Sequence, residues 1–84
     1  MLIQWGTTSI AGGAGEPTSQ AITFPIAYDT IPFVGESVVS TVPGTTVLGS
    51  GHGSDSTSGT TLYVTRSNTA NTSLRWLAIG YKEV

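Results

Sequence analysis

The chain closes on residues 71–84, NTSLRWLAIGYKEV, which form its most apolar stretch. Strand alternation divides this stretch into two faces, one with Leu74, Trp76, Ala78 and Gly80 and the other with Arg75, Leu77, Ile79 and Tyr81. Both faces are apolar through the middle, and a strand of this kind has to be covered on both sides. One face can fill the core of the domain. We expect a neighbouring chain to cover the other.

The size and cysteine content of the chain also point to association. Its 84 residues are enough for one domain, and we predict a single domain over residues 1–84. A folded monomer of this size buries only about 60–65% of its unfolded surface, which leaves its stability marginal. The chain has no cysteine for disulfides, and one histidine is too few for a structural zinc site. Oligomerisation is the remaining source of stability.

The charge is sparse and slightly acidic, with three Lys and Arg against five Asp and Glu. Such a chain offers little to a nucleic-acid backbone or an anionic membrane, so we expect neither partner. No run of residues is long and apolar enough for membrane insertion, and the N-terminal stretch lacks the pattern of a secretion signal. Charged residues make up only 10% of the chain, and Ser, Thr and Gly take the polar positions. This composition favours a β-structure surface.

Alternating apolar residues, with no helical periodicity, predict an all-β fold built as a small antiparallel β-sandwich. Residues 19–28, SQAITFPIAY, are predicted to form a half-buried strand with Ile22, Phe24, Ile26 and Tyr28 on one face. Pro25 cannot donate a ladder hydrogen bond, so this strand should lie at an edge or bend there.

Further strands are predicted at residues 33–42, 45–49 and 61–67. The first of these should end at Pro43 and Gly44. The last should bury Leu62 and Val64 and turn Tyr63 outward with Thr65. Residues 50–60, SGHGSDSTSGT, contain almost nothing to bury and are predicted to form a loop, as are residues 67–71.

Three segments in this order resemble the C-terminal domain of bacteriophage tail-fibre proteins: IQWGTTSI, ITFPIAYDTIPFVGESVVST and SLRWLAIGY. The resemblance implies a small β-sandwich, similar to H-type lectins, that forms a homotrimer at the distal tip of the fibre. It also implies localisation in the virion and attachment to a bacterial surface polysaccharide or outer-membrane protein. Residues 44–61 match no pattern of the family, so the identity of the receptor does not follow. We expect Leu77, Ile79 and Tyr81 to lie in the trimer interface.

The aromatic residues allow two interpretations, since an aromatic ring can stack on a sugar or pack in a core. Trp5 and Trp76 both lie in apolar strand runs, which favours core or interface positions. Among the tyrosines, Tyr63 is expected to face outward most clearly, and it is a candidate receptor contact.

The predicted loops supply the other receptor-binding candidates, His52, Asp55, Asn68 and Asn71. Their amide, imidazole and carboxylate groups suit a hydroxyl-rich glycan, although Gly, Ser and Asn are also common in any exposed turn. Contact through the sheet face around Tyr63 is the alternative. We expect no cofactor and no metal, because one carboxylate is too few for calcium. Three copies of His52 near a trimer axis could still hold an ion.

Catalysis is not expected from this sequence. His52 lies between glycines, which is a poor scaffold for a catalytic triad with Asp55, and no carboxylate sits in an apolar setting that would raise its pKa. The glycine-rich AGGAGEP lacks the lysine of a phosphate loop. A receptor-binding tip domain is therefore the leading hypothesis, and a structural trimerisation cap without receptor contact is the alternative.

Overall fold

A computed structural model describes residues 1–41, 44 and 46–83, which hold six strands and no helix. No helix in this part of the chain could therefore span a membrane. The strands are β1 (Leu2–Ala11), β2 (Pro17–Thr23), β3 (Phe33–Val39), β4 (Val47–Gly53), β5 (Gly59–Arg66) and β6 (Asn71–Gly80).

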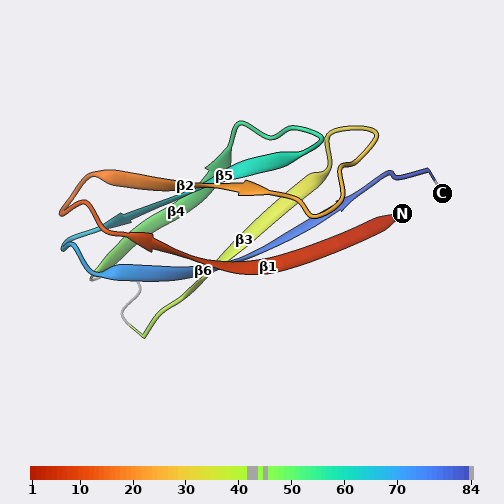
Figure 1. The fold of residues 1–84 in the computed structure, drawn as a ribbon. Coiled ribbons are helices and arrows are strands. Elements are labelled where there is room, and N and C mark those ends of the chain that lie inside the picture. The colour runs from red at the N-terminus through yellow and green to blue at the C-terminus, as the bar shows by residue number, and fades with distance from the viewer. Residues whose placement is uncertain (42–43, 45, 84) are drawn as a thin grey trace.

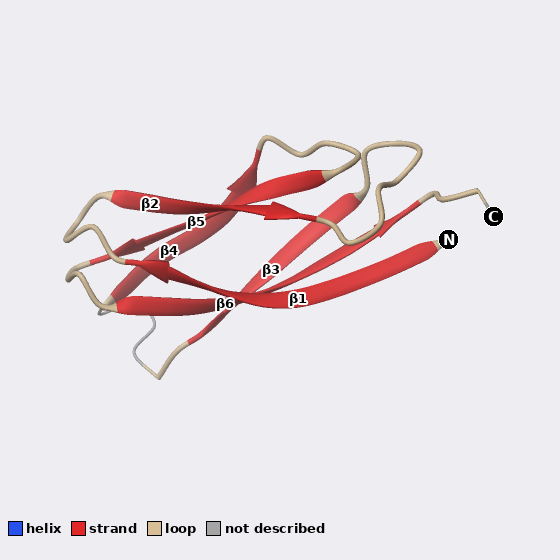
Figure 2. Ribbon diagram, in the orientation of Figure 1, coloured by secondary structure: helices blue, strands red, loops and turns tan. Residues whose placement is uncertain are grey.

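The strands form two three-stranded sheets, which lie as two layers in Figures 1 and 2. The first sheet has the order β1-β6-β3 and the second the order β2-β5-β4. Every pairing is antiparallel. The predicted all-β, antiparallel class is thus confirmed, and β5 and β6 occupy the sheet centres.

The core lies between the layers and is filled mainly by the two central strands. From β5, Leu62 and Val64 are buried, and from β6, Leu74, Trp76 and Ala78 are buried. The predicted alternation of β5 is confirmed, because Tyr63 is turned outward and remains exposed.

The outer face of β6 is not covered by the described part of this chain. Leu77 is 39% exposed and Arg75 is exposed, whereas the side chains on the inner face of the strand are buried. Trp5 pairs with Leu77 in the neighbouring strand and is 74% exposed. Trp76 therefore is a core residue as predicted, whereas a core position for Trp5 is wrong. For Trp5 the interface interpretation and the sugar-stacking interpretation both stay predictions.

The strand predicted over residues 19–28 is wrong in its second half, because β2 ends at Thr23. Beyond that point isolated hydrogen bonds hold the segment: the amides of Phe24 and Tyr28 donate to the carbonyls of Ser58 and Thr57, both at 2.8 Å. Between them the Gln4 side-chain nitrogen donates to the carbonyl of Ile26 at 2.8 Å, and its oxygen accepts from the Ile26 amide at 2.9 Å. Phe24 and Tyr28 still turn into the core, while Ile26 is 48% exposed. The apolar spacing thus predicted two core residues correctly without a strand to carry them.

The second correction concerns β4, which extends from Val47 to Gly53. His52 consequently lies in an edge strand and not in the predicted loop. Glycine weakens a strand, but pairing with β5 holds this one, after a register shift between Val47 and Gly49. β3 ends at Val39, earlier than predicted, and the predicted stop at Pro43 lies outside the described residues.

Gly6 is required by the packing of the core. A Cβ at this position would lie 2.8 Å from the indole nitrogen of Trp76 and 2.9 Å from two of its ring carbons. The ring is buried and rigid, so it cannot move aside cheaply.

We therefore expect Gly6→Ala to lower the free energy of unfolding by about 1–3 kcal/mol, the usual effect of overpacking. Gly49→Ala is the matched control, since a Cβ at this strand glycine would meet nothing within 4 Å. Urea unfolding of both variants beside the parent measures the difference. Equal stability of the two variants would contradict the packing described here.

Candidate functional site

His52 and Asp55 form one hydrogen-bonded cluster where β4 ends. The imidazole Nδ1 lies 3.0 Å from the Asp55 carboxylate. The buried Thr60 hydroxyl donates to the same carboxylate oxygen at 2.6 Å and to the carbonyl of Gly53 at 3.2 Å. The reversal of the chain after β4 is tight, and Ser54 adopts a positive φ of 53°. The cluster therefore ties the loop to the start of β5.

These contacts determine the ionisation of Asp55. Partial burial acts to raise the pKa of its carboxyl, but the hydrogen bonds from Thr60 and His52 and the charge interaction with His52 outweigh this effect. The pKa of Asp55 is lowered from its ordinary value of 3.8. The carboxylate is therefore charged near neutral pH and is already occupied by its own neighbours.

Asn68 and Asn71 belong to a different cluster, organised by the buried Arg66. The guanidinium donates from Nε to the Asn68 side-chain oxygen at 3.0 Å and from Nη1 to the Thr72 hydroxyl at 2.6 Å. A longer contact of 3.4 Å reaches the backbone carbonyl of Asn71. The Asn68 oxygen also accepts from the amide of Ala70 at 3.1 Å. This side chain therefore shapes the turn before β6.

The structure does not bring the two clusters together. Asp55 is bonded to Thr60 at the start of β5, whereas Asn68 is bonded to Arg66 at its end. The strand between Thr60 and Arg66 spans about 20 Å at the usual rise, and Figure 1 shows the two connections at opposite ends of β5. The candidate residues therefore form two separate surfaces.

No metal site is present within the described part of the chain. No group of three or more His, Cys, Asp or Glu side chains there could hold an ion. An ion shared by His52 from three chains stays an untested alternative to the expected absence of a metal.

Asp29 binds the segment that follows β6. Its carboxylate accepts from the amide of Glu83 at 2.8 Å and from Lys82 Nζ at 3.4 Å, and its amide donates to the carbonyl of Tyr81 at 2.9 Å. The backbone hydrogen bond from Glu83 is the main reason that the pKa of Asp29 is lowered, with Lys82 adding to it against a smaller desolvation effect. Asp29 thus acts as a structural anchor.

Exposed apolar side chains gather on the outer face of the sheet β1-β6-β3. The predicted interface residues lie here: Leu77 is 39% and Tyr81 54% exposed, and Ile79 is half-buried. Sequence reasoning did not assign Ile3 and Phe33 to this face, although both pair with Ile79 across the sheet. Together with Trp5 these residues form the apolar face, consisting of Ile3, Trp5, Phe33, Val39, Leu77, Ile79 and Tyr81.

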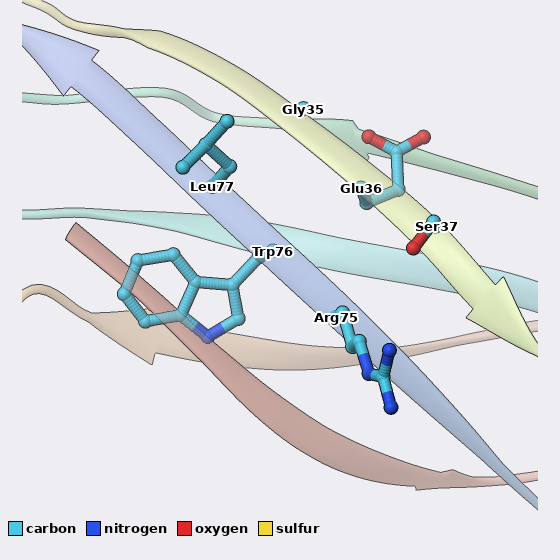
Figure 3. Close-up of a pocket in the computed structure, with 6 residues that line it drawn as sticks. All are labelled: Gly35, Glu36, Ser37, Arg75, Trp76 and Leu77. Atoms are coloured by element: carbon cyan, nitrogen blue, oxygen red, sulfur yellow. The ribbon is translucent and has the colours of Figure 1, made fainter. Parts of the chain in front are cut away.

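A hollow of about 300 Å³ opens between β3 and β6. Figure 3 shows Arg75 on β6 across from Ser37 on β3 and Leu77 across from Gly35. The Trp76 indole is turned toward β1 and away from the Glu36 carboxylate. Gly35 contributes no side chain at this point. A second hollow of about 300 Å³ lies beside Met1, Ile79 and Tyr81. The apolar face is therefore uneven and can receive projecting side chains.

Comparison with protein families gives one match over nearly the whole chain. Residues 1–81 match the model of a family described as tail fiber protein gp53-like, C-terminal. No curated protein matches the chain.

Solved structures with the same fold come from phage and pyocin fibres. The N-truncated R1-type pyocin tail fiber is 24% identical, with a TM-score of 0.73 over 94% of this chain and 70% of that one. Tailspike gp49 from Pseudomonas phage LKA1 is 20% identical, with a TM-score of 0.80 over 99% of this chain. Tailspike gp61 of Pseudomonas phage phi297 is 17% identical, with a TM-score of 0.72 over 90%. The chain spans only 15% of each tailspike.

The lowered pKa of Asp55 predicts a pH dependence of stability. A carboxyl with a lowered folded pKa stabilises the fold above its ordinary pKa of 3.8, and the contribution is lost as the pH falls through the folded value. The stability difference between the parent and Asp55→Asn should therefore be fully present well above pH 3.8 and shrink as the pH falls below 3.8. Urea unfolding at a series of pH values measures it, with the exposed Glu16→Gln as control. A difference that does not change with pH would contradict the assigned contacts.

Proposed function

The chain belongs to the gp53-like family of tail fibre C-terminal domains, and we propose that it is the receptor-binding domain at the distal tip of a bacteriophage tail fibre. In this role it attaches the virion to a bacterial surface polysaccharide or an outer-membrane protein. The match of residues 1–81 to the family is the observation that carries the proposal.

The proposed domain binds without catalysis. Two of the described carboxylates are already engaged, Asp55 with Thr60 and His52, and Asp29 with Lys82 and the amide of Glu83. Both pKa values are lowered, the reverse of what a general acid requires. Receptor contacts are proposed for His52, Asp55, Tyr63, Asn68 and Asn71. His52, Asp55 and Tyr63 lie on or beside β4 and β5, whereas Asn68 and Asn71 lie where β5 leads into β6.

We further propose that the domain is a β-sandwich of the H-type lectin kind that assembles as a homotrimer through the apolar face. Exposed aromatic and aliphatic side chains of this density are typical of protein interfaces. Trp5 and Phe33, at 74% and 72% exposure, extend the interface expected from Leu77, Ile79 and Tyr81. Association would also supply the cover that the outer face of β6 lacks.

A trimerisation cap without receptor contact is the second candidate, and the apolar face supports it equally well. The two functions differ in whether the assembled domain binds cells. Each receptor site would be present three times in a trimer, and linked sites raise overall affinity by about 100-fold or more where the spacing fits. A modest single site is therefore sufficient for attachment.

Assembly is tested by Leu77→Asp, which places a charge in the middle of the proposed interface. We expect three chains for the parent in light scattering and dissociated or unfolded chains for the variant, because the buried carboxylate has no partner. Ser19→Asp, on the outer face of the other sheet, should leave three chains. A folded parent monomer at micromolar concentration would refute the trimer.

Receptor binding is tested with the labelled 84-residue domain on a panel of bacterial strains. We expect saturable attachment to a subset of strains, and loss of attachment after periodate oxidation of the surface sugars if the receptor is a glycan. Attachment that survives periodate but not protease indicates an outer-membrane protein. Stable trimers that bind no strain would favour the cap.

A further inference from the structure

A cavity of about 340 Å³ opens on the sheet β2-β5-β4, away from the apolar face. It is lined by residues of two neighbouring strands, Gly49, Ser50 and Gly51 from β4 and Tyr63, Val64 and Thr65 from β5. The register pairs Gly51 with Tyr63 and Gly49 with Thr65, so these four residues face the same side of the sheet. Val64 and Ser50 point to the other side and contribute backbone.

The glycines of β4 have no structural explanation within the described part of this chain. Gly49 and Gly51 have no positive φ, and a Cβ at either position would meet nothing within 4 Å. A larger residue would fit both positions and would strengthen the strand. Glycine inside a strand often marks the close approach of a ligand to the backbone. The third outward glycine, Gly53, lies beside the Tyr63 ring, where an added Cβ would be 3.5 Å from a ring carbon.

Tyr63 provides the one exposed aromatic ring among the described residues of this face. It is 38% exposed and stands at the wall of the cavity, between the bare backbone of β4 and the hydroxyl of Thr65. An aromatic ring of this kind suits the apolar C–H face of a pyranose. Hydroxyl and backbone groups around it suit the equatorial hydroxyls of the sugar.

The outer face of the three strands β2, β5 and β4, as described over residues 17–23, 49–53 and 59–65, carries no charged side chain. Its outward positions are Pro17, Ser19, Ala21, Thr23, Gly49, Gly51, Gly53, Gly59, Thr61, Tyr63 and Thr65. An anionic or cationic ligand would find no side chain of opposite charge on these strands. A neutral ligand that carries hydroxyl groups needs no such partner. The face therefore matches neutral sugars better than phosphorylated or acidic ones.

We propose that the cavity beside Tyr63 is a subsite for one neutral saccharide unit of the bacterial surface glycan. The Tyr63 ring is the stacking platform, and Gly49 and Gly51 keep the floor open so that the sugar reaches the backbone. The proposal rests on the proposed function and narrows it to one face and one ligand class.

Two variants test the subsite from opposite directions. Gly51→Val fills the floor with a residue that the strand accepts, so the melting temperature should stay equal or rise while glycan binding falls. Tyr63→Ala removes the platform. We expect both to weaken binding by about tenfold or more, as loss of a central contact usually does. Thr23→Val adds an apolar group elsewhere on the same face, so it should bind nearly as well as the parent. Tyr63→Phe keeps the ring and should therefore bind better than Tyr63→Ala.

The readouts are attachment to a susceptible strain, binding to an array of neutral and acidic oligosaccharides, and the oligomeric state. Parent-like binding by folded Gly51→Val would refute the subsite and leave the proposed function standing. Binding of the parent only to acidic glycans or to a protein receptor would also refute it. A changed oligomeric state in Gly51→Val would identify this face as a contact between chains instead. A parent that binds no strain overturns the proposed function and this subsite together.

Discussion

The packing of β1 and of the segment after β2 depends on contacts with the Trp76 indole. Its ring occupies the space over Gly6 on the neighbouring strand, so there is no room for a side chain at position 6 opposite Trp76. Phe24 packs against it at 5.6 Å between ring centroids, and Tyr28 meets Phe24 edge-on at 5.5 Å. The Tyr28 hydroxyl then donates to the carbonyl of Ala78 at 2.8 Å. One side chain thus joins two strands to a segment that has left the sheet.

The aromatic side chains of Trp76, Phe24 and Tyr28 are buried in the core between the two sheets. The outer faces of the two sheets differ from each other in polarity. The outer face of β1-β6-β3 carries Trp5, Phe33 and Leu77, whose exposure in water is unfavourable until another surface covers them. The outer face of β2-β5-β4 carries hydroxyls, glycines and Tyr63. The division fits a domain that uses one side for assembly and keeps the other for a ligand.

The sequence predicted β5 and β6 well because their alternation has a period of two and ends in recognisable turns. It was wrong at residues 24–28, which lie outside β2 although the amides of Phe24 and Tyr28 still donate to the carbonyls of Ser58 and Thr57. The side chain of Gln4 binds the backbone of Ile26 between them. A hydrogen bond between residues 22 positions apart leaves no local signal in the chain.

The candidate site was less predictable, because composition describes loops and not their positions in space. His52 and Asp55 are close in the sequence and do meet, but Asn68 lies beyond the far end of β5. A signal for the sheet face was nevertheless present: glycines at positions 49, 51 and 53 alternate with other residues. In a loop this spacing has no meaning, whereas in a strand it removes every side chain from one face. Bare backbone on one face of an edge strand leaves room for a ligand to approach, and this alternation is the sequence signal behind the proposed subsite.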